Sequence, residues 1–78
     1  MKNKLKKKLL FILKKIKNVN YKKENIFEKF DSIEMLNLIS AIEKEFQIKI
    51  NYLFLNKKNF RDLNILTNLI YKIKNEKL

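Results

Sequence analysis

The residues of this chain with the clearest potential for chemistry are Asp31 and Ser32, which open the stretch DSIEMLNLISAIEKEF. Apolar residues recur there every three or four positions, which predicts a helix with one buried face. The predicted buried residues are Ile33, Leu36, Ile39, Ile42 and Phe46. Glu34 follows Asp31 by three residues, so the two predict an N-terminal capping box. Ser32 would then present its hydroxyl at an exposed, electropositive helix N-terminus, where backbone N–H groups favour an attached anion.

Two segments precede this helix and must position it. A first helix is predicted over residues 3 to 17, because apolar residues at helical spacing share one face and lysines fill the rest. That face holds Leu5, Leu9, Ile12, Leu13 and Ile16. Residues 18 to 30 are polar and predict a loop, which the apolar Ile26, Phe27 and Phe30 would pin to the core.

The segments after residue 46 complete the predicted fold. Residues 47 to 51 predict an extended connection with Ile48 and Ile50 turned inward, and residues 52 to 59 a short helix or turn. A last helix is predicted from Arg61 or Asp62 to Lys74. It would bury Leu63, Leu66, Leu69, Ile70 and Ile73. Residues 1–78 are therefore expected to form a single all-α domain, a small four-helix bundle of three longer helices and one short helix.

The composition removes several classes of function. The chain contains no Gly, Pro, Cys or His. Disulfides, thiol catalysis, the usual zinc sites and a histidine general base are thereby excluded, and we expect neither a metal site nor an enzyme. The absence of Gly also makes turns with positive φ unexpected. Five aromatic residues are expected in the core rather than as base-stacking platforms: Phe27, Phe30, Phe46, Phe54 and Phe60.

The formal net charge of +11 is unevenly distributed. Residues 1–23 carry +10, residues 24–46 carry −4 and residues 47–78 carry +5. The acidic middle coincides with the Asp31-Ser32 helix, so we expect no nucleic-acid partner. The positive charge is either functional or a consequence of coding bias, since Lys, Asn and Ile are all abundant. The longest uncharged apolar run, residues 9 to 13, is too short to span a membrane, and a cytoplasmic protein is expected.

The sequence resembles the acyl carrier proteins over essentially its whole length. Asp31-Ser32-Ile33 is similar to the family's Asp-Ser-Leu motif, and residues 36 to 46 are similar to its second helix. Ile48-Lys49-Ile50 resembles the Ile-x-Ile that follows, and residues 59 to 63 resemble the lead-in to the last helix. The resemblance implies a bundle of acyl-carrier type that carries acyl or aminoacyl groups as thioesters on a 4′-phosphopantetheine arm attached to Ser32.

The same resemblance implies the partners and the roles of single residues. Asp31 would assist modification by a phosphopantetheinyl transferase. The surface docking a loading ligase and downstream acyl-transfer enzymes would comprise Glu28, Glu34, Met35, Leu38, Glu43 and Glu45. The carrier is expected to be a monomer. Fatty-acid synthesis, an aminoacyl carrier and a carrier for polyketide or cell-surface biosynthesis all remain open as pathways.

Two departures from the family and several alternatives remain open. Lys29 stands where the family has Gly three residues before the modified serine, and the second helix is poorer in acid. Ser32 could be only a helix-start residue, the glutamates a solvated face, and Met35 and Leu38 core residues. The alternative function is a non-enzymatic basic module whose lysine-rich first helix contacts anionic membrane or nucleic acid.

Overall fold

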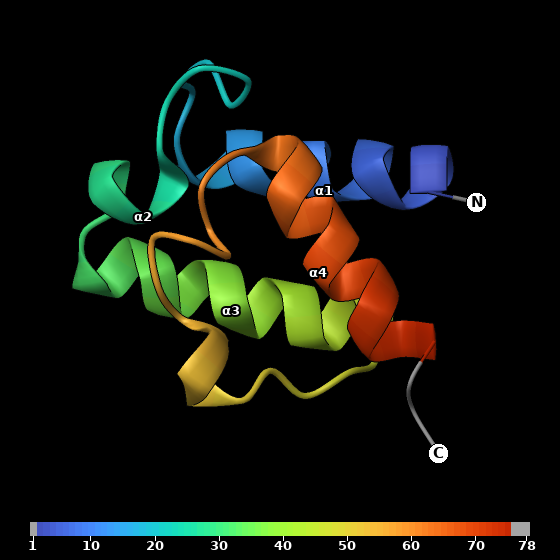
Figure 1. Cartoon of the computed structure of the whole chain (residues 1–78). Helices are drawn as coiled ribbons and strands as arrows, with labels where there is room; N and C mark the ends of the chain where they lie inside the picture. The colour runs from blue at the N-terminus through green and yellow to red at the C-terminus, as the bar shows by residue number, and fades with distance from the viewer. Residues whose placement is uncertain (1, 76–78) are drawn as a thin grey trace.

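The fold was examined in a computed structural model that describes residues 2–75, which are all-helical apart from the connections (Figure 1). It contains four α-helices, three of them long, and one turn of 3₁₀-helix. In chain order they are α1 (Lys2–Ile16), α2 (Ile26–Lys29), α3 (Ser32–Phe46), η1 (Tyr52–Phe54) and α4 (Leu63–Asn75). The all-α prediction of three longer helices and one short helix is confirmed.

The core lies where α1 packs against both α3 and α4 (Figure 1). Leu5, Leu9 and Leu13 of α1 are buried at spacings of four residues, so one stripe of that helix faces its partners. The largest fully buried side chains are Leu9, Leu13, Ile26, Leu38, Ile42, Phe60, Leu66 and Ile70. These residues come from every α-helix and from the loop before α4, so a single core spans the described chain.

The long connection between α1 and α3 is fixed by backbone hydrogen bonds to the segment before α4. The N–H groups of Ile26 and Phe27 donate to the carbonyls of Arg61 and Phe60, at 2.9 and 3.0 Å, and the N–H of Leu63 donates to the carbonyl of Tyr21. Ile26 and Phe30 are buried, as expected, whereas Phe27 is only partly buried. Because the start of α3 directly follows this connection, the same bonds position Ser32.

The predicted helix bounds agree with the structure to within one or two residues, but two details differ. The four-residue helix α2 lies inside the stretch predicted as a loop, because one helical turn has no periodicity to detect. Phe54, expected in the core, is 38% exposed. The extended connection after α3 does turn Ile48 and Ile50 inward, as predicted.

Helix α3 ends in left-handed backbone, which the sequence did not lead us to expect. Gln47, the C-cap, has φ 54° and ψ 51°, and its N–H donates to the carbonyl of Glu43. Helices often end in this conformation, which glycine adopts at least cost. The expectation that a glycine-free chain avoids positive φ was therefore wrong at this position, where the end of the helix outweighs the residue's preference.

Candidate functional site

The candidate site is the start of α3, where Ser32 is the first helical residue. The carboxylate Oδ1 of Asp31 accepts a hydrogen bond from the N–H of Glu34 at 2.8 Å. In return, Oε1 of Glu34 accepts one from the N–H of Asp31 at 2.9 Å. The predicted capping box is confirmed. Ser32 is exposed, and no residue within 2–75 forms a hydrogen bond with its hydroxyl. The hydroxyl is therefore available to a reagent from solvent.

Lys17, which follows α1, links this helix start to the two preceding elements. Its Nζ donates to Oε1 of Glu34 at 3.1 Å and to the backbone carbonyl of Lys29 at 2.7 Å. One carboxylate oxygen of Glu34 thus accepts from both the Asp31 N–H and the Lys17 ammonium. Because charge-assisted hydrogen bonds are the stronger kind, this arrangement fixes where α3 begins relative to α1 and α2.

Tyr21 lies behind the same network. Its buried hydroxyl donates at 3.0 Å to the carbonyl of Leu13, which also accepts the N–H of Lys17. The carbonyl of Lys17 is within hydrogen-bonding reach of the same hydroxyl, so Tyr21 ties the connection back to the end of α1. Burial, and secondarily the negative charge of Glu34, raise the pKa of Tyr21 to about 12. Neither Lys17 nor Tyr21 was predicted as part of the site. Lys17 is one of ten lysines in residues 1–23, and no local pattern distinguishes it.

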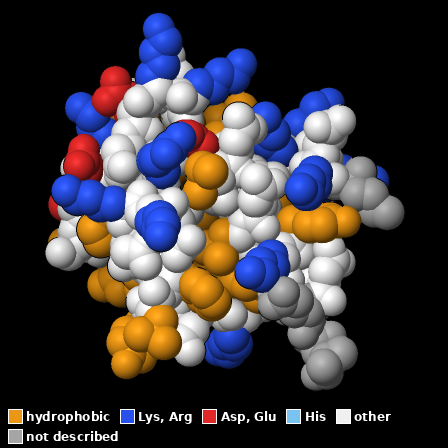
Figure 2. Space-filling view, in the orientation of Figure 1, with side chains coloured by type: hydrophobic (Ala, Val, Ile, Leu, Met, Phe, Trp, Pro, Cys, Tyr) orange, Lys and Arg blue, Asp and Glu red, His pale blue; other side chains and the backbone are white. Residues whose placement is uncertain are grey.

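The outward face of α3 beside Ser32 is apolar and neutral. Ile33 and Leu36, which were expected in the core, are 71% and 69% exposed. The expectation was wrong because α3 has apolar residues on several sides, and the stripe that packs inward is Leu38, Ile42 and Phe46. In the space-filling view, hydrophobic side chains gather at the left and lower edge, over the start of α3 and over η1 (Figure 2). Two apolar side chains are thus exposed within one turn of Ser32.

The glutamates expected to form a docking surface are each engaged within the chain. Glu28 pairs with Lys57 at 3.1 Å, Glu34 with Lys17, and Glu45 with Lys8 at 3.7 Å. Glu43 accepts a hydrogen bond from the N–H of Ile50 at 2.8 Å. Each of these acids therefore has a partner among residues 2–75, which offsets part of the negative charge that the docking surface was expected to present.

The other residues expected in the docking surface are turned inward. Leu38 is fully buried and Met35 packs partly against the core. Leu38 is consequently unavailable to a partner, and the expectation that it lies on a docking surface is corrected: it is a core residue. Met35 is accessible only in part.

Lys29 does not disturb the helix start. It lies in the last turn of α2, its φ is not positive, and its ammonium pairs with Glu24 at 3.2 Å. The backbone at this position therefore does not require the glycine that the related family places there.

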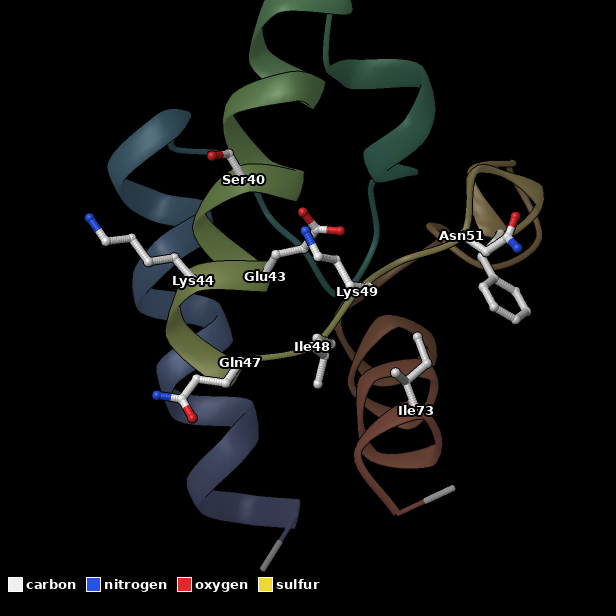
Figure 3. A pocket seen from close by; sticks show the side chains of 9 residues that line it. Ser40, Glu43, Lys44, Gln47, Ile48, Lys49, Asn51 and Ile73 are labelled. Atoms are coloured by element: carbon white, nitrogen blue, oxygen red, sulfur yellow. The ribbon is translucent and has the colours of Figure 1, made fainter. Parts of the chain in front are cut away.

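A groove of about 780 Å³ opens on the side of α3 that faces the extended connection (Figure 3). Ser40 and Glu43 of α3 lie on one side and Asn51 on another, with Ile48 and Ile73 of α4 between them in this view (Figure 3). Phe54 also lines the groove. Glu43 points toward the connection that it holds through Ile50. The groove begins two turns beyond Ser32 on the same helix, so it is separate from the hydroxyl.

The described residues contain neither a membrane-crossing element nor an evident metal site. None of the helices within residues 2–75 is long and apolar enough to cross a bilayer. Over the same range, no three carboxylates come together as potential ligands. The exposed hydroxyl of Ser32 and the apolar face beside it are therefore the features on which a function can be argued. Comparisons with protein-family models, with curated proteins and with solved structures found no match to this chain.

Proposed function

We propose that the chain is a carrier of acyl-carrier type that holds acyl or aminoacyl groups on a 4′-phosphopantetheine arm attached to Ser32. The observation that carries the proposal is the exposed hydroxyl of Ser32, which has no hydrogen-bond partner among residues 2–75 and lies at the first position of a fifteen-residue capped helix, directly after Asp31. The order of the helices, with a long tethered connection before Ser32, also agrees with what the resemblance to that family implies.

The residues present fit the attached group. When bound, the group supplies a thiol on which cargo is held as a thioester. In the attachment step, Oγ of Ser32 would form a bond to the phosphorus of a nucleotide-linked phosphopantetheine donor. The phosphoanhydride bond of the donor would break, the nucleotide phosphate would leave, and the hydroxyl proton would pass to the transferase or solvent. The resulting phosphodiester would lie at the helix N-terminus, where the first N–H groups have no intrahelical acceptor. Asp31 uses Oδ1 in the cap, which leaves Oδ2 to assist the modification.

The surface around Ser32 also indicates how partners would bind. Ile33 and Leu36 offer apolar contact within one helical turn of the hydroxyl, and the glutamates around them are already paired. We therefore expect the transferase, the loading ligase and the acyl-transfer enzymes to dock mainly through apolar contacts, with less electrostatic steering than an acidic helix would give. In this proposal the chain is a cytoplasmic monomer that transports cargo and leaves catalysis to its partners.

The test is the intact mass of the protein after co-expression with a broad-specificity phosphopantetheinyl transferase. We expect a mass gain of one phosphopantetheine in the wild type and none in Ser32→Ala. The chain offers a matched control, because its one other serine, Ser40, is also exposed on α3. Ser40→Ala should be modified like the wild type.

Two results would contradict the proposal. One is the absence of a mass gain in folded wild-type protein with several transferases. The other is a gain that persists in Ser32→Ala and disappears in Ser40→Ala. Circular dichroism of each variant shows that the fold is intact, since both serines are exposed and their truncation leaves the core unchanged.

A further inference from the structure

On the outward face of α1, lysines surround an exposed aromatic side chain. Phe11 is 64% exposed, although most of the other large apolar residues of α1 face the core. At about 100° per residue, five lysines lie within about 60° on either side of Phe11 on the helix surface. We call these residues the Phe11–lysine face: Lys4, Lys7, Lys8, Phe11, Lys14 and Lys15, all of them exposed.

This face carries positive charge that the chain scarcely neutralises. Helix α1 contains no acidic residue. Within residues 2–75, only Lys8 of this face forms an ion pair, with Glu45 at 3.7 Å, and both side chains are about half exposed. Lys15 instead places its ammonium 4.9 Å from the centre of the Phe11 ring. Four of the five lysines thus have no acidic partner among residues 2–75.

The fold does not require Phe11 at this position. The face that packs against α3 and α4 is occupied by Leu5, Leu9 and Leu13, on the opposite side of α1. An exposed aromatic ring among solvated lysines contributes little to the core, yet it is the type of residue that amphipathic interfacial helices place at a membrane boundary. The expectation that lysines fill the rest of this helix therefore misses Phe11, the apolar residue at the centre of the exposed side.

We infer that the Phe11–lysine face docks on an anionic phospholipid surface, with the axis of α1 parallel to the membrane. The lysines would lie over the lipid phosphates along about 16 Å of helix, and Phe11 would insert at the boundary between head groups and acyl chains. Lys15 leaves the ring and its alkyl stem extends toward the head groups. Of the acids that the structure describes, Glu45 alone forms an ion pair with this face, through Lys8.

The ring favours lipid over nucleic acid as the occupant. Lysines attract the phosphates of either, because the attraction is electrostatic and independent of sequence. The surface of a duplex offers no apolar environment to a phenyl ring at the centre of the contact. The membrane interface does offer one. Single-stranded nucleic acid stacks on aromatic platforms, and several rings usually contribute; this face has one. Ser32 is not part of the face, so docking is independent of its modification.

The first measurement uses a fluorophore at the centre of the face. The chain contains no Trp, so Phe11→Trp introduces a single reporter. We expect its emission to shift to the blue on addition of phosphatidylglycerol–phosphatidylcholine vesicles, and not on addition of phosphatidylcholine vesicles. Tyr52→Trp, at an exposed site on η1, is the matched control and should not shift with either. The absence of a shift in Phe11→Trp, or an equal shift in the control, would overturn the inference.

The second measurement is vesicle sedimentation of the full chain with its lysines altered. Each lysine near an anionic surface contributes roughly a fivefold factor, so Lys7→Gln with Lys14→Gln should reduce partitioning roughly 25-fold. The control pair, Lys58→Gln with Lys72→Gln, removes the same charge from exposed sites elsewhere and should change partitioning far less. Equal losses in both pairs would overturn the face as the contact.

Phe11→Ala separates lipid from nucleic acid. It should lower partitioning to anionic vesicles roughly tenfold, the effect of losing about half of the burial free energy of a phenyl ring. Binding to a single-stranded oligonucleotide should remain weaker than binding to vesicles at the same ionic strength. Tighter binding to the oligonucleotide, or vesicle binding that is unchanged in Phe11→Ala, would contradict the lipid assignment.

Discussion

At the scale of single residues, Tyr21 makes the fold sensitive to alkaline pH. Burial raises the pKa of its phenol from 10.0 to about 12, so the unfolded chain releases this proton before the folded chain does. Its contribution is complete below pH 10 and is lost as the pH rises toward 12. We expect up to roughly 3 kcal/mol of the unfolding free energy to disappear over that range, measured by urea denaturation at successive pH values.

The matched control for this titration is Tyr21→Phe. Any other charge change over this pH range occurs in both proteins, so the difference between the two curves isolates Tyr21. At neutral pH the variant should be less stable by about 1–2 kcal/mol, because the hydroxyl that reaches the carbonyls of Leu13 and Lys17 is lost. A difference that stays constant between pH 9 and 12 would show that the phenol ionises as readily in the folded state.

Local signals determined which parts of the site could be predicted. The capping of α3 could be predicted from two residues three positions apart, Asp31 and Glu34, and the structure confirms it. The link from Lys17 to Glu34 spans seventeen positions and depends on how α1 and α3 pack, so no neighbouring residue signals it. The same holds for the pair of Glu28 with Lys57, which places an ammonium beside a carboxylate that was expected to face a partner.

At the scale of the elements, the C-terminus of α3 offers a stabilising substitution. Gln47 has left-handed backbone, which costs a residue with a Cβ roughly 1 kcal/mol relative to glycine. We expect Gln47→Gly to be more stable than Gln47→Ala by about that amount in chemical denaturation. Comparing these two variants cancels the contacts of the glutamine side chain, since both lack it. Equal stability of the two would show that the backbone at this position is not strained.

The elements themselves could be predicted where their periodicity is long. Helices α1, α3 and α4 each repeat their apolar residues over at least three turns, and their ends were predicted within two residues. The orientation of α3 about its axis could not be predicted, because Ile33 and Leu36 have the same helical spacing as the residues that face inward. In the folded chain, the stripe of Leu38, Ile42 and Phe46 packs inward. Ile33 and Leu36 are left exposed, and they form an apolar surface beside Ser32.

For the whole molecule, the described ion pairs couple the three charge segments of the chain. Acids of the negative middle segment pair with lysines of the positive first and last segments, as Glu45 does with Lys8 and Glu28 with Lys57. The sequence predicted the charge of each segment but not this pairing, which follows from the packing of distant helices. The folded chain still retains a net charge of +11, much of it on α1.

Excess positive charge predicts that salt stabilises the molecule. Sodium chloride screens both the exposed ion pairs and the repulsion between unpaired lysines, but exposed pairs contribute little, so relief of repulsion dominates. If about 1 kcal/mol is recovered between 20 and 300 mM salt, the melting temperature should rise by about 4–8 °C. The variant Lys7→Gln with Lys14→Gln should melt higher at low salt and respond less. A melting temperature that is unchanged or lower at 300 mM would mean that the ion pairs contribute more to stability than the repulsion removes.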